Sequence, residues 1–243
     1  MVCLAAIRLL GLLLSYVVLL KTLFPVRLGS TLVLTPYTQK LLGSLELPVL
    51  GRSADDASRR ALKEALRSLA RSSRGGVETF SAADQTLFDD TLASLAALNP
   101  TESPARSPLF SGQWECLWTT ESELNFAVDK GLFGLPWERT YQTIDVEGGT
   151  LENVIQFEDG FLRVGSTISP DAERGERFTF AFNECAVRYR QIELPLPPVG
   201  RGWGELLYLD DEFRVQRDVR GDLLIATRVA AGGRGAVGPL GRV

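Results

Sequence analysis

Residues 112–120 read GQWECLWTT, and the spacing of apolar side chains changes there from a helical period to an extended one. Trp114, Cys116 and Trp118 are separated by single residues, which is the two-residue period of a strand with one buried face. Segments of the same kind follow as far as residue 229, with turn residues between them. The sequence therefore predicts about eight or nine short antiparallel strands over residues 112–229.

Turn signals and aromatic residues organise this strand region. A barrel of about eight strands encloses a space that side chains fill or that holds one small ligand. The aromatic residues on the predicted strands either form the core or line a cavity for a lipophile, and their pattern leaves both readings open. The expected turns are Gly148-Gly149, Asp159-Gly160 and Arg220-Gly221, and the aromatic residues are Trp114, Trp118, Phe157, Phe178, Phe180 and Phe182.

Two helices are predicted before the strands, over residues 53–100. A cap signature at Ser53 is followed by leucines at helical spacing, and the pair Gly75-Gly76 ends that helix. Ser81 repeats the cap, and Asn99-Pro100 ends the second helix. The short loop between them favours an antiparallel pair whose apolar stripes pack on the barrel or on each other.

The two ends of the chain have a different composition from this body. Residues 1–52 carry five basic residues and one acidic residue, whereas the whole chain has a net charge of −4. The uncharged run 9–20 is shorter than the roughly 18–20 residues of a spanning helix. Residues 1–52 are interpreted as a targeting leader and linker, and a cleaved signal, a retained anchor and a transit peptide stay open. Residues 230–243 are expected to be a flexible Gly-rich tail, although they match G-x-G-x-x-G literally, because no helix follows the glycines.

The composition excludes several kinds of chemistry. The chain has no histidine, which removes His-dependent triads, His-ligated zinc and imidazole bases. Its three cysteines do not form a disulfide framework; Cys116 and Cys185 are expected to be buried thiols, with a bridge as the alternative. The acidic clusters at residues 210–212 and at Glu121 and Glu123 are interpreted as solvated turns. We therefore predict no catalytic site, no metal and no cofactor, and the net negative charge argues against nucleic acid.

Several blocks occur in the order and spacing of a known family. They are ALKEAL at residues 61–66, LNPT at 98–101, GQWECLWTT at 112–120, YQTIDV at 141–146 with Asn153, and YLDDEFRV at 208–215 with Arg217. Together they resemble the plastid lipid-associated (fibrillin) family over about residues 57–229. The resemblance implies a domain over residues 53–229, with the helical pair at 53–100 and a lipocalin-like barrel at 112–229.

The resemblance also implies a function. It indicates a non-enzymatic protein of the plastid (chloroplast), associated with plastoglobules or thylakoids. The leader at residues 1–52 departs from the Ser-rich transit peptide that is usual in the family. Its partners would be lipids or lipophilic small molecules such as carotenoids and quinones, together with a membrane or lipid-droplet surface. A membrane-anchored scaffold with a filled barrel is the alternative.

Candidate ligand-binding residues follow from the motif positions and from the aromatic pattern. Structural hydrogen bonding is the alternative role of the polar residues, and core packing is that of the aromatic ones. The candidates are Trp114, Trp118, Gln142, Asn153, Phe180, Asp211, Arg214 and Arg217.

Overall fold

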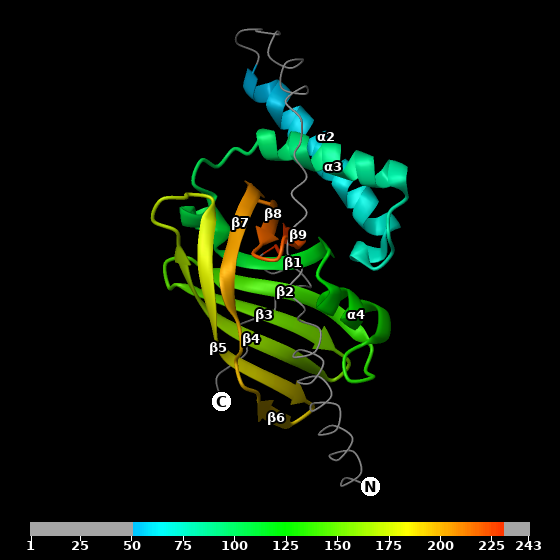
Figure 1. Ribbon diagram of the computed structural model, residues 1–243, viewed down its shortest axis with the longest axis vertical. Helices are drawn as coiled ribbons and strands as arrows, with labels where there is room; N and C mark the ends of the chain where they lie inside the picture. The colour runs from blue at the N-terminus through cyan, green and yellow to red at the C-terminus, as the bar shows by residue number, and fades with distance from the viewer. Residues whose placement is uncertain (1–50, 231–243) are drawn as a thin grey trace. The chain divides into compact units, whose positions relative to one another are not determined.

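The structure, a computed structural model, describes residues 51–230, and its strands form one closed antiparallel barrel (Figure 1). The strands are β1 (Gly112–Thr119), β2 (Trp137–Asp145), β3 (Thr150–Phe157), β4 (Gly160–Pro170), β5 (Arg177–Tyr189), β6 (Ile192–Pro195), β7 (Arg201–Leu209), β8 (Phe213–Asp218) and β9 (Leu223–Arg228). Eight of them form the ring β1-β2-β3-β4-β5-β7-β8-β9, while β6 pairs only with β5. The predicted mainly β class and lipocalin-like antiparallel barrel are confirmed.

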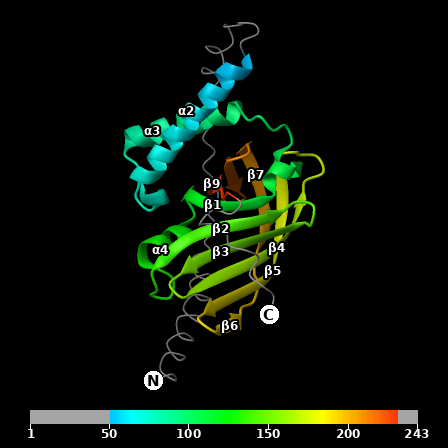
Figure 2. The same cartoon turned by 180° about the vertical axis from the view of Figure 1, so that it is seen from behind.

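Helical segments precede the barrel and interrupt it once. They are α2 (Gly51–Ser72), η1 (Arg74–Gly76), α3 (Ala82–Ala97), η2 (Pro104–Arg106), η3 (Pro108–Phe110) and α4 (Ser122–Lys130). The first helix begins before the expected cap at Ser53, whereas Ser81 does cap the second, since its hydroxyl accepts a bond from the Asp84 amide at 3.1 Å. Figures 1 and 2 both show α2 and α3 crossing beside the end of the barrel nearest β8 and β9. The predicted helical pair is therefore present.

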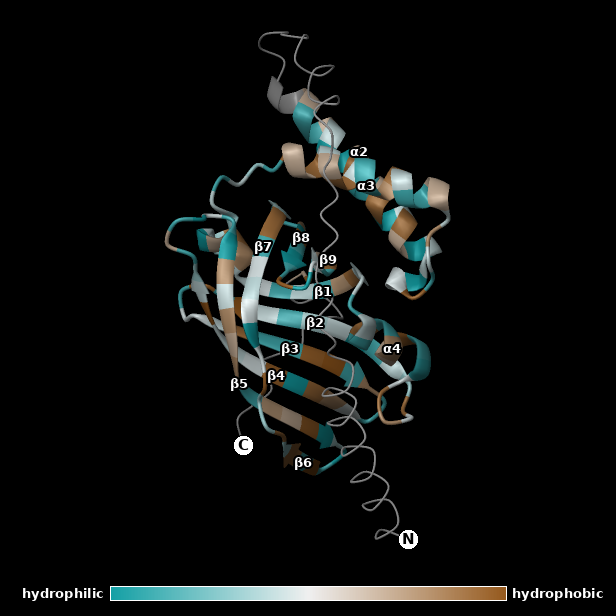
Figure 3. Ribbon diagram, in the orientation of Figure 1, coloured by the Kyte–Doolittle hydropathy of each residue, from teal (hydrophilic) through white to brown (hydrophobic). Residues whose placement is uncertain are grey.

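The outer face of β7, β8 and β9 forms a core with the helices. Leu66 and Leu95, both fully buried, come from the two helices, and Phe213, Val215 and Ile225 come from the strands. Hydrophobic and hydrophilic residues alternate along the barrel strands and around both helices (Figure 3). Because neighbouring strand residues point to opposite faces, this outer contact turns the side chain of Arg214, which lies between Phe213 and Val215, into the barrel.

The inside of the barrel has its own core. At one end Phe110 and Trp114 are fully buried among Ile144, Leu206 and Leu209. The rings of Phe178 and Phe180 also point inward and lie against glycines of β7: a Cβ added at Gly204 would be 2.6 Å from the Phe178 ring. This end of the barrel is therefore filled by side chains.

A bulge in β1 separates the two tryptophans that the sequence placed on one face. Cys116 pairs with Ala226, whereas Trp118 pairs with Ile225, so the register shifts between them. As a result Trp114 packs inside the barrel and Trp118 packs under the helices. The expectation of a shared face was wrong, because strict alternation does not survive an inserted residue.

Other local expectations also need correction. Helix α4 was not predicted. The sequence predicts two successive strands at residues 178–182 and 185–194, but Arg177–Tyr189 form the single strand β5, with a register shift near its centre. Gly148-Gly149 is the sequence signal of a two-residue hairpin turn, but the turn is longer, because β2 already ends at Asp145. Among residues 51–230 no helix is both long and apolar enough to cross a membrane. The leader predicted over residues 1–52 falls, apart from its last two residues, outside the described part, as does nearly all of the tail 230–243.

Candidate functional site

The site is centred on Arg214, a strand β8 residue whose side chain points into the barrel. Its exposed fraction is 0%, and strand alternation places it between the outward-facing Phe213 and Val215. The guanidinium carbon lies 5.2 Å from the Trp114 ring centroid and 5.4 Å from that of Phe110. Aromatic faces attract a cation, so these rings provide part of the stabilisation that water would otherwise give.

A chain of hydrogen bonds links three of the predicted polar residues across the interior. Arg214 Nη2 donates to Gln142 Oε1, and Gln142 Nε2 donates to Asn153 Oδ1 at 2.7 Å. Arg214 of β8 and Gln142 of β2 are 72 positions apart in the sequence, whereas Gln142 and Asn153 face each other in the β2–β3 hairpin. The structure thus brings Trp114, Gln142, Asn153 and Arg214 together.

The charge of Arg214 is incompletely satisfied. Its Nε and Nη1 have no hydrogen-bond partner within residues 51–230, and neither does Oε1 of its interior neighbour Gln216. Burial lowers the pKa of Arg214 to about 9, and the positive charge of Arg228 acts in the same direction. An unpaired buried cation is costly, so this arrangement destabilises the ligand-free fold.

Arg228 is the second arginine beside Trp114, with its guanidinium carbon 4.2 Å from the ring centroid, but it differs from Arg214 in its hydrogen-bond partners. Its Nε donates to the Asp211 carbonyl at 2.6 Å, and its Nη1 donates to the Ser111 carbonyl at 2.8 Å. Backbone acceptors therefore hold Arg228 at the filled end of the barrel. Among residues 51–230, Arg214 has no such set of acceptors.

A pocket of about 480 Å³ reaches the barrel beside this site. It lies between the end of α2, η1, the end of β1, α4 and the start of β2. Most of its lining side chains are apolar, and Arg71 and Arg74 are its charged residues. Its lining is Ala70, Arg71, Arg74, Gly75, Cys116, Leu117, Thr119, Leu124, Asn125, Val128, Trp137 and Thr140. Arg214 pairs with Ala226, which in turn pairs with Cys116. Ala226 is therefore the one residue between Arg214 and the lining residue Cys116 along this row of paired strands.

The remaining candidates lie elsewhere. Trp118 donates from its indole nitrogen to Ser73 Oγ at 3.1 Å beneath the helices, and Arg217 pairs with Glu205 at 2.6 Å on the outer face. Asp211 is exposed on the turn between β7 and β8. Phe180 lies inside the barrel, stacked on Phe182 at 5.4 Å. None of the eight candidates, Trp114, Gln142, Asn153 and Arg214 included, lines the pocket, so any ligand contact by them stays a prediction.

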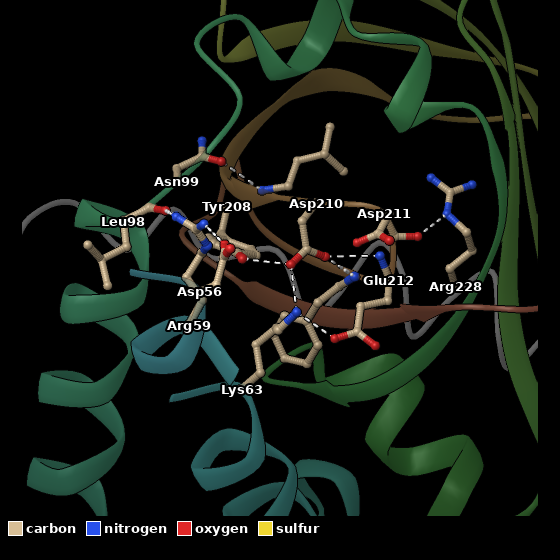
Figure 4. Close-up of polar contacts among 12 residues, drawn as sticks. Asp56, Arg59, Lys63, Leu98, Asn99, Tyr208, Asp210, Asp211, Glu212 and Arg228 are labelled. Carbon is tan, nitrogen blue, oxygen red and sulfur yellow. Dashed lines mark hydrogen bonds and ion pairs between the residues drawn. The ribbon is translucent and has the colours of Figure 1, made fainter. Parts of the chain in front are cut away.

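The acidic turn at residues 210–212 binds the first helix. Lys63 of α2 lies 2.7 Å from Asp210 Oδ2 and also contacts Glu212, as Figure 4 shows. Tyr208 donates to the same Asp210 oxygen at 2.7 Å. The interpretation as a merely solvated turn was wrong for Asp210, because only 13% of its side chain is exposed. Sequence reasoning missed Lys63, because its partners Asp210 and Glu212 are 147 and 149 positions away and nothing in the neighbouring sequence points to them.

The second acidic cluster surrounds Arg220. This guanidinium pairs with Glu121 at 3.8 Å, Glu123 at 2.9 Å, Asp218 at 3.1 Å and Asp222 at 3.1 Å. Burial raises the pKa of Glu121 to about 7, although Arg220 acts in the opposite direction. Glu121 is therefore not a solvated turn residue. No acidic or cysteine cluster within residues 51–230 has the arrangement of a metal site, and Cys116 and Cys185 are free thiols.

Sequence reasoning also missed the pocket residues and the polar neighbour Gln216. Cys116 was treated only as a small buried thiol, and burial raises its pKa to about 12. One available signal was the alternation FRVQ at residues 213–216, in which two polar residues share a face opposite two apolar ones. With helices packed on the apolar face, that pattern requires a polar interior.

Comparisons with known proteins show the family to which the chain belongs. The family model described as PAP_fibrillin matches residues 59–227. The chain is 47% identical over 120 residues to the "Probable plastid-lipid-associated protein 11, chloroplastic" of Arabidopsis thaliana, covering 49% of this chain and 56% of that protein. It is 34% identical over 158 residues to the "Probable plastid-lipid-associated protein 5, chloroplastic" of the same plant, covering 62% of each.

The matched parts thus amount to 56% and 62% of these two relatives' length. No solved structure is significantly similar to the chain. The comparisons bear on the family, while the geometry of the site comes from the described residues themselves.

Proposed function

Because the chain belongs to the plastid lipid-associated (PAP/fibrillin) family, we propose that it is a non-enzymatic plastid protein whose barrel binds lipophilic molecules. Carotenoids, quinones and lipids are the classes of ligand, and plastoglobules or thylakoids are the proposed location. Both relatives carry "chloroplastic" in their names, which supports a plastid location.

The pocket of about 480 Å³ is the observation that carries this proposal. Its volume falls within the roughly 300–1,000 Å³ of small-molecule sites, which are mostly apolar with a few convergent polar groups. Leu117, Leu124, Val128 and Trp137 provide apolar walls. The polar chain that begins at Arg214 lies on strands next to the lining residue Cys116, because Arg214 and Cys116 both pair with Ala226. Polar groups therefore lie near the apolar walls.

Direct binding by the full-length protein tests the proposal. Tryptophan quenching by a carotenoid and by a long-chain quinone should saturate, and Val128→Trp should weaken it about tenfold because the larger ring fills the pocket. Phe126→Trp is the matched control, since Phe126 lies on the same helix, is 60% exposed and does not line the pocket. Absence of binding to either class, or equal weakening by both variants, would contradict ligand binding in the pocket.

The second candidate is a membrane-anchored scaffold with a filled barrel. It is favoured by one observation, the complete burial of Phe110 and Trp114 at one end of the interior. The candidates differ in two measurable ways. A scaffold would bind none of these lipophiles, and N-terminal sequencing of the mature protein would find residues 9–20 retained as an anchor.

A further inference from the structure

Two cations are buried within residues 54–230, Lys63 and Arg214, and only one is neutralised. Lys63 meets the carboxylates of Asp210 and Glu212. The positive charge of Arg214 meets only the Gln142 amide oxygen and the faces of two rings among the described residues. A buried charge without a partner is unfavourable by several kcal/mol even after the protein relaxes. An oxyanion supplied from outside the chain would offset that cost.

The guanidinium is held in position for such an anion. Its Nη2 is bound by Gln142, and Gln142 is held in turn by Asn153. The rings of Phe110 and Trp114 limit its rotation, while Nε and Nη1 are left as unused donors. Arginine presents its donors in a rigid planar fork that matches carboxylate oxygens, and charge-assisted bonds of this kind are stronger than neutral ones.

The route from the pocket to these donors is short. Arg214, Ala226 and Cys116 follow one another across paired strands, and Cys116 already lines the pocket. The middle residue has only a methyl group, so a ligand atom that passes the Cys116 side chain comes next to the guanidinium. The hydrocarbon part of the same ligand would then lie against Leu124 and Val128 of α4.

We propose that the barrel selects lipophiles that carry a carboxylate head group, and that Arg214 receives this head group at the inner end of the pocket. The inference rests on the proposed function and adds the class of ligand to it. A neutral ester or alcohol of the same chain length would fill the pocket but leave the charge of Arg214 unpaired. The protein therefore distinguishes an acid from its ester by the head group alone.

The test uses three probes with one hydrocarbon chain: an unsaturated 18-carbon fatty acid, its methyl ester and its alcohol. Titration of the full-length protein at about pH 8 should give at least about tenfold tighter binding for the acid. In Arg214→Met the preference should vanish, because affinity for the acid falls to that for the ester while affinity for the ester stays within about twofold. Arg190→Met is the control, since Arg190 is an arginine paired with Asp159, is 67% exposed and does not line the pocket.

Each outcome is informative. Equal affinity for the acid and the ester would overturn the head-group proposal and leave lipophile binding standing. No binding of any probe would overturn the proposed function as well. Loss of acid and ester binding together in a folded Arg214→Met would show that the residue shapes the pocket instead of selecting the head group.

A measurement on the unaltered protein covers the case in which the variant does not fold. A fatty acid labelled with carbon-13 at its carboxyl group reports its own ionisation through its chemical shift. Bound beside Arg214, it should stay ionised between about pH 8 and pH 5, because an adjacent cation lowers the pKa of a carboxyl group. Titration of the bound signal near the pKa of the acid on neutral vesicles would overturn the proposal.

Discussion

Lys63 and Arg214 are two buried cations on opposite faces of the β7–β8 hairpin. Lys63 approaches from helix α2 on the outside and binds the hairpin carboxylates of Asp210 and Glu212. Arg214 belongs to the hairpin itself, points inside, and has no carboxylate partner in the described part of the chain. The outer contact therefore completes the fold, whereas the inner one is left for a ligand to complete.

The pKa shifts of the two side chains express the same difference. Burial by itself would lower the pKa of Lys63, but hydrogen bonds to Asp210 and Glu212 outweigh it and the pKa is raised. Burial also dominates at Arg214, where it outweighs the opposing interaction with Cys116 and the pKa falls to about 9. One short segment thus contains a satisfied cation site and an unsatisfied one.

Removing the outer cation is the largest predicted effect. Lys63→Met leaves Asp210 buried without its cation, and we expect the free energy of unfolding to fall by about 2–4 kcal/mol. Urea unfolding at neutral pH measures it. Arg71→Met is the control, because Arg71 is 63% exposed and its pair with Glu64 should contribute less than about 1 kcal/mol. Equal stability of the two variants would show that the Lys63 pairs do not stabilise the helix docking.

A second prediction concerns the filled end of the interior. Gly204→Ala would place a methyl group 2.6 Å from the Phe178 ring. We expect a loss of about 1–3 kcal/mol from overpacking. Adding Phe178→Leu should recover part of it, so the double variant is less destabilised than the sum of the single ones. Simple additivity in thermal unfolding would mean that the two residues do not share this space.

The cluster around Arg220 supplies a third, smaller effect. Because burial raises the pKa of Glu121 to about 7, the folded protein binds a proton there that the unfolded chain releases at a lower pH. Stability should therefore fall as pH rises from about 4.5 to 7. Glu121→Gln should remove this fall and add about 1 kcal/mol at pH 8. Glu123→Gln is the control, because the pKa of Glu123 is lowered. Burial alone would raise this pKa, but hydrogen bonding to the Glu123 backbone amide and the charge of Arg220 outweigh burial. A gain of similar size in both variants would contradict the assignment to Glu121.

Much of this fold follows from periodicity in the sequence. The change at residues 112–120 predicts the strands, and the leucine spacing after Ser53 predicts the helix that packs on them. The ring order and the bulge between Cys116 and Trp118 do not follow, because they depend on pairing between distant segments. Helix α4 was missed since it is short and lies between two strands.

The site was only partly predictable for the same reason. The family pattern pointed to Gln142, Asn153 and Arg214, which the structure brings together. It pointed equally to Asp211 and Arg217, which lie on the turn and the outer face. Which face a residue occupies depends on what packs against its neighbours, and a single sequence does not contain that information.

If Arg214 serves a ligand and not the fold, its removal should not destabilise the ligand-free protein, and the stability of Arg214→Met measures this. In delipidated protein we expect a free energy of unfolding that is unchanged or raised by up to about 2 kcal/mol, because an uncompensated buried charge is removed. Lys63→Met, measured in parallel, should show the opposite sign. A loss of more than about 2 kcal/mol in Arg214→Met would mean that the fold depends on Arg214.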